Sequence, residues 1–328
     1  MIHHISLFQG SSTDPYYNLA VEEHLMETVK PGECILYLWQ NRNTVVIGRN
    51  QNAWKECRTT LLEQEGGFLA RRLSGGGAVF HDLGNLNFTF LACDEDYDQN
   101  RQFDVICRAC RTLGVPAEVS GRNDLLVEGR KCSGSAFYHH NGRSYHHGTL
   151  LVHVDLERLG RYLSPSRAKL EAKGVESVRA RVVNLRDYVP SLTCQEMGQI
   201  VETAFSRVYG LPLERLTPEA LDSAEVERLR VRNGSREWLY GARLPFSFIC
   251  EGKFPWGELT LELTVERGIV RQAKVWSDAM DWRIAPVLEQ ALPGCLFELA
   301  ALQKRLQTVL EPSEAVKDLC GLLEEQNI

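Results

Sequence analysis

RRLSGGGAVFHD, the stretch from Arg71 to Asp82, carries the strongest structural and chemical signal in the sequence. Consecutive glycines weaken both helices and strands, so this run indicates a turn where the backbone closely approaches another group. Two arginines and a serine flank the turn, and guanidinium groups together with backbone N–H groups bind phosphate or carboxylate. The stretch therefore predicts an anion-binding loop between two strands, although a Gly-rich surface hairpin beside an arginine pair fits the glycines equally well.

The composition is that of a globular protein with its own hydrophobic core. The chain has 328 residues, of which 44% are hydrophobic and 24% charged, and its formal net charge is -6. This length predicts one large domain or two. The acidic net charge argues against nonspecific nucleic-acid binding. No apolar run approaches the ~18 residues of a membrane span. The first residues do not resemble a signal peptide. We therefore expect neither nucleic acid nor membrane as a partner.

The ten cysteines are scattered along the chain, several of them in apolar or helical contexts. Cys107 and Cys110 share one face of a predicted helix, where a zinc site and a pair of buried thiols are the alternatives and buried thiols are favoured. Scattered cysteines are typical of proteins in a reducing compartment. The sequence therefore predicts free thiols and a cytoplasmic location.

Local signals predict both helices and strands. Asp14-Pro15 combines an N-cap with proline at the first helical position and begins a helix that runs to about Val29. Asn141-Gly142 is the strongest hairpin signal in the chain. Thr193 and Glu196 have the spacing of a capping box and predict a helix to about Tyr209. Hydrophobic patterns predict the other elements, which are strands at 34–39, 44–48, 85–91, 130–138 and 144–154 and a helix at about 104–113.

These elements predict an α+β fold with a mixed, mostly antiparallel sheet and flanking helices. The glycine stretch is not a Rossmann fingerprint, because it does not lead from a strand into a helix with an acidic residue at the required distance. Beyond residues 241–245 the pattern changes to strands at 258–265 and 269–275 followed by helices. We therefore predict a catalytic domain over 1–244 and a small α+β accessory domain over 245–328.

Several segments together resemble a known family. With RRLSGGGAVFHD, they are NTVVIGRNQN (43–52), WKEC (54–57), GRNDLLVEGRKCSGSA (121–136) and HHGTLLVH (146–153). Their combination closely resembles the lipoate–protein ligase A family of biotin/lipoate ligases. The resemblance covers essentially the whole chain, including an additional C-terminal region, and implies a biotin/lipoate ligase-like catalytic domain.

The resemblance implies an enzyme that catalyses two half-reactions. Lipoate and ATP give lipoyl-AMP and pyrophosphate, and the lipoyl group then moves to a lysine of a lipoyl domain. The implied acceptors are the E2 subunits of 2-oxoacid dehydrogenases and the H protein of glycine cleavage. Lipoate or octanoate is the implied small-molecule substrate, and ATP and Mg²⁺ are the implied cofactors.

This chemistry needs a fixed positive charge, because a carboxylate must attack the α-phosphate of an anion. Lys131 matches the family lysine that contacts both groups and is the predicted catalytic residue. Arg72 matches the nucleotide-binding arginine. Asp124 is a candidate Mg²⁺ ligand, although Asn123-Asp124 also fits an Asx turn. The predicted nucleotide-binding residues are Arg72, Gly75, Gly76, Gly77, Ala78, Val79, Phe80, Asn123, Asp124 and Lys131.

The acyl chain of the substrate needs an apolar tunnel, whose burial contributes ~0.8 kcal/mol per CH₂ group. Leu19, Trp39 and Val46 are candidate walls, with ordinary core packing as the alternative for each. His81 and His147 lie beside the binding segments, where ligand contact and a structural role both remain open. The predicted substrate-binding residues are Leu19, Trp39, Val46, Arg71, Ser74, His81 and His147.

Features of the sequence also bear on three other functions. An octanoyl or lipoyl transferase would use a cysteine thioester, and Cys132, next to Lys131, is the candidate nucleophile. Successive strand residues point to opposite faces, however, so Cys132 faces away from the site if Lys131 faces it. Biotin ligation is disfavoured, because RRLSGGG differs from the GRGRxG pattern and no helix-turn-helix precedes it. The intact binding segments argue against a carrier or adaptor without activity.

Overall fold

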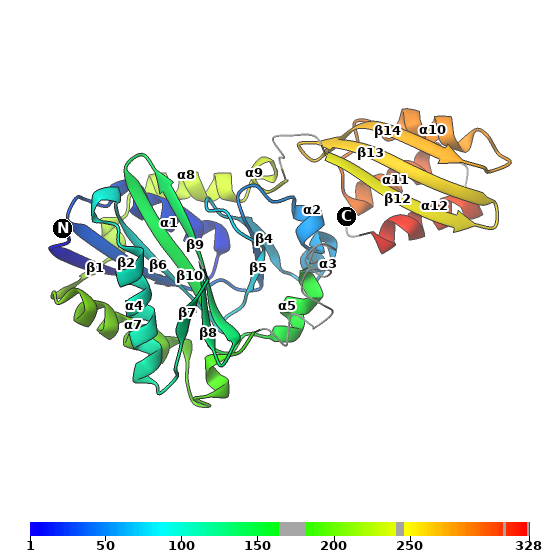
Figure 1. The fold of residues 1–328 in the computed structure, drawn as a ribbon. Coiled ribbons are helices and arrows are strands. Elements are labelled where there is room, and N and C mark those ends of the chain that lie inside the picture. Colours follow the sequence, from blue (N-terminus) through cyan, green and yellow to red (C-terminus); the bar gives the residue numbers. More distant parts are fainter. Residues whose placement is uncertain (122, 164–181, 241–245, 311–312, 327) are drawn as a thin grey trace. The chain divides into compact units, whose positions relative to one another are not determined.

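We describe the protein from a computed structural model of residues 1–328, which defines all of them except 122, 164–181, 241–245, 311–312 and 327 (Figure 1). The chain divides into two compact units. Unit 1 consists of Met1–Gln51 and Gly66–Gly234, and unit 2 consists of Asn52–Glu65 and Ser235–Ile328. Within the described residues, no helix combines the length and the hydropathy that a membrane crossing needs.

Unit 1 is built on an eight-stranded sheet with the strand order β11-β1-β2-β6-β10-β9-β8-β7. Its strands are β1 (His4–Gln9), β2 (Glu33–Trp39), β6 (Asn85–Cys93), β7 (Glu118–Ser120), β8 (Asp124–Val127), β9 (Arg130–His140), β10 (Arg143–Leu151) and β11 (Leu213–Leu216). β1 runs parallel to β2 and β11, and the other neighbours pair antiparallel. The predicted α+β fold with a mixed, mostly antiparallel sheet is thus confirmed.

Helices cover both faces of this sheet (Figure 1). One layer is α4 (Gln99–Thr112) with α7 (Cys194–Tyr209), and the other is α1 (Pro15–Thr28) with α8 (Ser223–Asn233). Strand alternation divides the side chains between the two layers. In β2, Leu36 and Leu38 belong to the core under α4 and α7, whereas Tyr37 and Trp39 belong to the core under α1.

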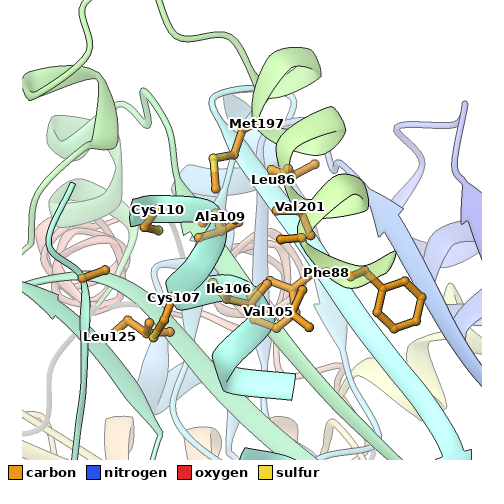
Figure 2. Close-up of a cluster of buried hydrophobic side chains, with 14 of the residues drawn as sticks. Leu86, Phe88, Val105, Ile106, Cys107, Ala109, Cys110, Leu125, Met197 and Val201 are labelled. Atoms are coloured by element: carbon orange, nitrogen blue, oxygen red, sulfur yellow. The ribbon is translucent and has the colours of Figure 1, made fainter. Parts of the chain in front are cut away.

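The core under α4 and α7 is filled by apolar side chains (Figure 2). α4 begins after Asp98, whose side chain accepts a hydrogen bond from the Arg101 N–H. The helix therefore starts earlier than the sequence predicted, because this N-cap was not recognised. Cys107 and Cys110 are buried free thiols in this core, and the described residues contain no group of three or more His, Cys, Asp or Glu side chains that could hold a metal ion.

Two of the local predictions are confirmed residue by residue. Asn141 and Gly142 have φ angles of 50° and 74°, and they join β9 to β10 in the predicted hairpin. Thr193 and Glu196 form a capping box that opens α7, and the helix ends at Gly210 in the left-handed conformation. Both motifs depend on neighbouring residues alone, so they can be predicted without knowledge of the fold.

The glycine stretch lies in a second sheet of unit 1, which is three-stranded with the order β4-β3-β5. Its strands are β3 (Thr44–Ile47), β4 (Phe68–Arg71) and β5 (Val79–His81), and α5 (Leu156–Tyr162) packs on β5. β4 is parallel and β5 antiparallel to β3. The RRLSGGG turn therefore leaves β4 and returns as β5.

Unit 2 joins the C-terminal residues to a segment from the first half of the chain. Its elements are α2 (Ala53–Glu56), α3 (Thr59–Gln64), α9 (Arg236–Tyr240), the antiparallel strands β12 (Phe246–Phe254), β13 (Gly257–Glu266) and β14 (Ile269–Ser277), and the helices α10 (Ile284–Ala291), α11 (Leu299–Val309) and α12 (Glu314–Glu325). The Trp54 ring packs against Tyr240, Phe246 and Phe297 at centroid distances of 5.0 to 5.2 Å. The predicted domain boundary at residues 244/245 lies outside the described residues and stays a prediction.

We expect a chain truncated after Tyr240 to keep unit 1 folded but to expose Cys57. The truncation removes Phe246 and Phe297, which pack on Trp54, and Cys57 lies fully buried between α2 and α3. Alkylation should modify Cys57 in the truncated chain only, and peptide mass spectrometry detects the modification. Cys132, buried in the core of unit 1, is the internal control and should stay protected in both chains. Equal protection of Cys57 in the two chains would show that residues 1–240 alone suffice to bury it.

Candidate functional site

Residues of α1, the main sheet and the small sheet line a cavity of about 150 Å³ in unit 1. An apolar cavity of about that volume accepts a benzene-sized ligand in another protein. The predicted site residues that line it are Leu19, Trp39, Val46, Arg72, Gly76, Gly77, Ala78, Val79, His81, Asn123, Lys131 and His147. The lining residues that sequence reasoning did not assign to the site are Asn87, Gly134, Ser135, Ala136, Gly148 and Thr149.

The lining changes from exposed residues at one end to buried residues at the other, where Leu19, Trp39 and Val46 form apolar walls beside buried polar side chains. Gly76 and Asn123 are exposed, and Lys131 is half-buried. Leu19 and Trp39, by contrast, are almost completely buried. A ligand with an anionic head and an apolar tail therefore fits with its head near Lys131 and its tail among the buried side chains.

A β-bulge in β9 determines which side chain reaches the cavity. The register of β9 against β8 shifts at Leu125/Leu126 and leaves Cys132 as the extra residue. Gly134 and Ala136 line the cavity, so strict alternation from them would turn Cys132, and not Lys131, toward it. Because of the bulge, Lys131 lines the cavity and Cys132 is buried in the opposite core.

The ammonium group of Lys131 is held at the open part of the cavity. Its Nζ atom lies 2.7 Å from Asp124 Oδ1, and the two side chains are 35% and 34% exposed. An ion pair with that exposure is weak, so the lysine charge remains available to a ligand. The side chain passes over Gly134, where a Cβ atom would lie only 2.5 Å from Nζ. Gly134 therefore provides the space that Lys131 occupies.

Arg72 lies inside the glycine loop and holds its backbone. Its Nη2 atom donates to the carbonyl oxygens of Gly75 and Gly77, both at 2.7 Å, and its Nη1 atom donates to that of Val46 at 3.1 Å. Gly76 has a φ angle of 90°, and a Cβ atom there would lie 2.9 Å from Arg72 Nη2. Burial lowers the pKa of Arg72 to about 10, so the guanidinium still carries its charge at neutral pH.

The predicted site residues outside the lining have other contacts. Arg71 Nη1 donates to three backbone carbonyls in residues 48–51 and so holds the turn that follows β3. Phe80 is buried, and its ring lies 5.4 Å from that of Tyr162. Gly75 and Asp124 are chain neighbours of the lining residues Gly76 and Asn123, and Ser74 Oγ lies 2.8 Å from Nε2 of the lining residue His147. The ligand contacts predicted for all five residues stay predictions.

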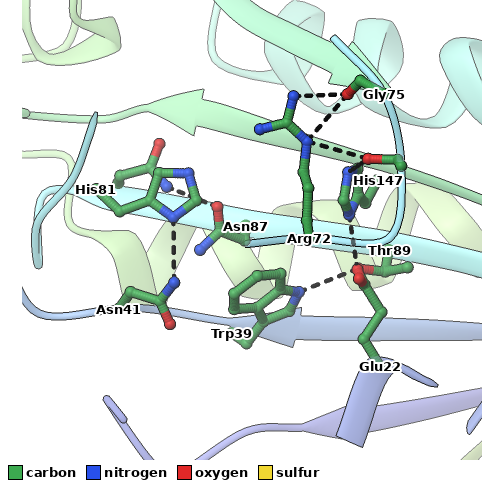
Figure 3. Close-up of polar contacts among 11 residues, drawn as sticks. Glu22, Trp39, Asn41, Arg72, Gly75, His81, Asn87, Thr89 and His147 are labelled. Atoms are coloured by element: carbon green, nitrogen blue, oxygen red, sulfur yellow. Dashed lines mark hydrogen bonds and ion pairs between the residues drawn. The ribbon is translucent and has the colours of Figure 1, made fainter. Parts of the chain in front are cut away.

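Sequence reasoning missed Glu22, although its carboxylate contacts both Thr89 and His147 beside the cavity (Figure 3). Glu22 is 2% exposed and accepts hydrogen bonds from Thr89 Oγ1 at 2.7 Å and His147 Nδ1 at 2.9 Å. On α1 it follows Leu19 by three positions and therefore shares the buried face of the helix. A carboxylate at an apolar helical position was the signal that could have identified it.

His81 is a neutral side chain in the buried part of the cavity. Burial, together with the nearby Arg72 charge, lowers the pKa of His81 to about 3. The side-chain oxygen of Asn41 accepts a hydrogen bond from Asn18 at 2.9 Å, which leaves the amide nitrogen of Asn41 facing His81. This nitrogen can only donate, so His81 Nδ1, 3.2 Å away, is the acceptor. The proton of His81 is therefore on Nε2. Among the described residues, neither this Nε2–H nor the side-chain amide nitrogen of Asn87 has a hydrogen-bond partner.

Comparisons with known proteins agree with this geometry. The family described as "Lipoyl protein ligase A/B catalytic domain" matches residues 14–206, and "Bacterial lipoate protein ligase C-terminus" matches residues 244–318. The structure of P. falciparum LipL1 in complex with lipoate is similar, with 25% identity, a TM-score of 0.64 and coverage of 98% of this chain and 99% of that one.

Two further solved structures resemble part of the chain. One is a bi-partite lipoate protein ligase with its E2 lipoyl domain from Thermoplasma acidophilum, at 27% identity and a TM-score of 0.64, covering 74% of this chain and 98% of that one. The other is a lipoate-protein ligase A bound with ATP, at 26% identity and a TM-score of 0.62, covering 74% of this chain and all (100%) of that one.

Proposed function

The chain belongs to the lipoyl protein ligase A/B family, and from this premise we propose that it is an ATP-dependent lipoate–protein ligase. It converts lipoate and ATP to lipoyl-AMP and pyrophosphate, and then transfers the lipoyl group to a lysine of a lipoyl domain. The observation that carries the proposal is a single cavity in which buried apolar walls lead to an available lysine ammonium beside a glycine loop.

Lys131 supplies the positive charge that adenylation needs. The carboxylate of the acid and the α-phosphate of ATP repel each other, and a preorganised ammonium between them stabilises the charge of the transition state. Asp124 neutralises Lys131 in the absence of ligand, because their charged atoms are 2.7 Å apart. Binding of the two anions replaces this weak pair by stronger contacts to the ammonium.

Asp124 also fits as the protein ligand of Mg²⁺. Proteins hold Mg²⁺ through one or two carboxylates together with substrate phosphates, so a single half-exposed carboxylate at the open part of the cavity is sufficient. The ion, when bound, neutralises phosphate charge. Coordination by Asp124 would also release Lys131 from its ion pair.

The acyl chain is proposed to lie among Leu19, Trp39 and Val46, in the buried part of the cavity. Its burial contributes ~0.8 kcal/mol per CH₂ group, which favours lipoate or octanoate over short acids. We propose lipoyl domains of E2 subunits or the H protein as acceptors, by analogy with the bi-partite ligase and its E2 lipoyl domain. The free cysteines fit the reducing cytoplasm that we propose as its location.

The direct test is pyrophosphate release from ATP, measured with lipoate and then with octanoate in place of lipoate. Transfer is tested by the mass increase of an added E2 lipoyl domain. The proposal predicts that both reactions require ATP. Transfer that proceeds from an acyl carrier without ATP would instead favour the octanoyl or lipoyl transferase with a cysteine thioester.

Cys132 distinguishes the ligase from that transferase. A thioester mechanism needs an accessible thiol with a lowered pKa, whereas burial raises the pKa of Cys132 to about 12 and leaves its side chain fully buried. We expect Cys132→Ala to retain ATP-dependent lipoylation and to lose ~1 kcal/mol of stability. Intact mass after incubation with lipoate and ATP should show no acyl thioester. Loss of acyl transfer in Cys132→Ala, with normal folding, would overturn this assignment.

A further inference from the structure

A continuous series of hydrogen bonds connects a wall of the cavity to the arginine of the glycine loop (Figure 3). On one side, Trp39 Nε1 donates to Thr89 Oγ1 at 3.0 Å, and Thr89 donates to Glu22 at 2.7 Å. On the other side, Arg72 Nε donates to Ser74 Oγ at 3.0 Å. Ser74 Oγ lies 2.8 Å from His147 Nε2, and His147 Nδ1 lies 2.9 Å from Glu22.

The chemistry of the end groups fixes the direction of these hydrogen bonds. An indole N–H and a guanidinium can only donate, and an ionised carboxylate can only accept. Because an ionised Glu22 can only accept, His147 Nδ1 carries the proton that points to it. In a ring with a single proton, Nε2 is then an acceptor and receives the Ser74 proton, while the Ser74 oxygen accepts from Arg72. Every donor in the series therefore points toward the carboxylate.

We propose that Glu22 is a positioning residue for nucleotide binding. Its carboxylate holds His147 as the Nδ1–H tautomer, and in this form His147 accepts from Ser74, which in turn holds Arg72 inside the glycine loop. Glu22 does not line the cavity, so its effect passes through the other residues. The inference rests on the proposed function, because it assigns the glycine loop to ATP.

Burial explains why this carboxylate is present. An isolated buried carboxylate is costly, and it persists only where other groups satisfy its charge and its hydrogen bonds. Glu22 receives two hydrogen bonds on one oxygen, and the buried guanidinium of Arg72 is close enough for its pKa to respond to the Glu22 charge. Without the acceptor, nothing holds the imidazole proton on Nδ1. With the proton on Nε2, His147 would donate to Ser74, and the Ser74 proton, which now points to His147, would have to turn away and alter the position of the oxygen that Arg72 contacts.

The first test is the tautomer itself, which does not depend on ligase activity. Nitrogen-15 shifts of labelled histidines, with the His147 signals assigned by their loss in His147→Gln, should show a neutral ring protonated at Nδ1. In Glu22→Leu the proton should move to Nε2. A wild-type ring that carries its proton on Nε2, or on both nitrogens, would overturn the inference even if the protein proves to be a lipoate ligase.

The second test separates nucleotide binding from the other steps. In pyrophosphate release, Glu22→Leu should raise KM for ATP by about tenfold or more, the effect of misplacing Arg72 and so losing one hydrogen bond to a charged group, with a smaller change in KM for lipoate. Glu22→Gln keeps an acceptor oxygen and should return KM for ATP to within about threefold of the wild-type value, since the acceptor and not the charge sets the tautomer.

Glu23 provides the matched control on the same helix. It is also buried, but it pairs with Arg232 on α8, where Arg232 Nη1 donates to its Oε1 atom at 2.8 Å. Glu23→Leu should lower thermal stability without changing KM for ATP. Equal increases in KM for ATP in Glu22→Leu and Glu23→Leu would show a general packing effect and overturn the inference. Absence of pyrophosphate release in the wild-type protein, with the tautomer as described, would overturn the proposed function instead.

Discussion

Replacing Lys131 with alanine should lower the rate of adenylate formation by ~10²–10³ or more, the effect of removing one preorganised group that stabilises charge in a transition state. The fold should remain intact, because the side chain is 35% exposed and its ion pair with Asp124 contributes little to stability. Pyrophosphate release measures the first effect, and thermal unfolding measures the second.

Arg130 is the control for this substitution. It is the neighbouring cation on β9, its Nη2 atom donates to the Tyr188 hydroxyl at 3.3 Å, and it does not line the cavity. Arg130→Ala should therefore retain pyrophosphate release. Near-wild-type release by Lys131→Ala would remove the basis for assigning catalysis to Lys131.

Gly76→Val should weaken binding of a stable lipoyl-adenylate analogue by about tenfold or more. The φ angle of 90° is unfavourable for a β-branched residue, and a Cβ atom would lie 2.9 Å from Arg72 Nη2. The loop must then open or displace the guanidinium that holds the Gly75 and Gly77 carbonyls. Calorimetry measures the affinity. Because the residue is exposed, the free energy of unfolding should fall only by the backbone strain at this position, ~1–3 kcal/mol.

Gly142→Val separates backbone strain from ligand binding. Gly142 also has a positive φ angle, of 74°, and a Cβ atom there meets nothing within 4 Å. It lies at the β9–β10 turn and is not part of the cavity lining. This variant should lose stability but keep the affinity for the analogue. Unchanged affinity in Gly76→Val as well would assign a purely structural role to the glycine loop.

The sequence predicted those parts of the structure that depend on local signals. The Asn141-Gly142 turn and the Thr193 capping box were identified because each requires particular residues at adjacent positions. The glycine stretch and Lys131 were identified by their resemblance to a family, and the structure brings them to one cavity. Which contacts they make with ligands stays a prediction.

Other features depend on contacts between distant segments and could not be predicted. Alternation alone placed Lys131 and Cys132 on opposite faces, but the register shift opposite Leu125/Leu126 decides which of the two faces the cavity. Nothing local identifies that bulge. Glu22 is recognised as a hydrogen-bond acceptor only when β6 and β10 bring Thr89 and His147 to it. Gly134 is needed because of where the Lys131 side chain runs.

The assignment of α2 and α3 to unit 2 has a mechanical consequence for any large movement of that unit. The backbone passes between the units at residues 51/52, 65/66 and 234/235, so a single flexible linker does not govern their motion. A large rotation must either separate Trp54 from Phe246 and Phe297 or carry the whole hairpin of α2 and α3 with it. In the second case the movement of α2 and α3 pulls on the ends of β3 and β4, the strands that precede and follow them in the chain. The glycine loop begins at the end of β4.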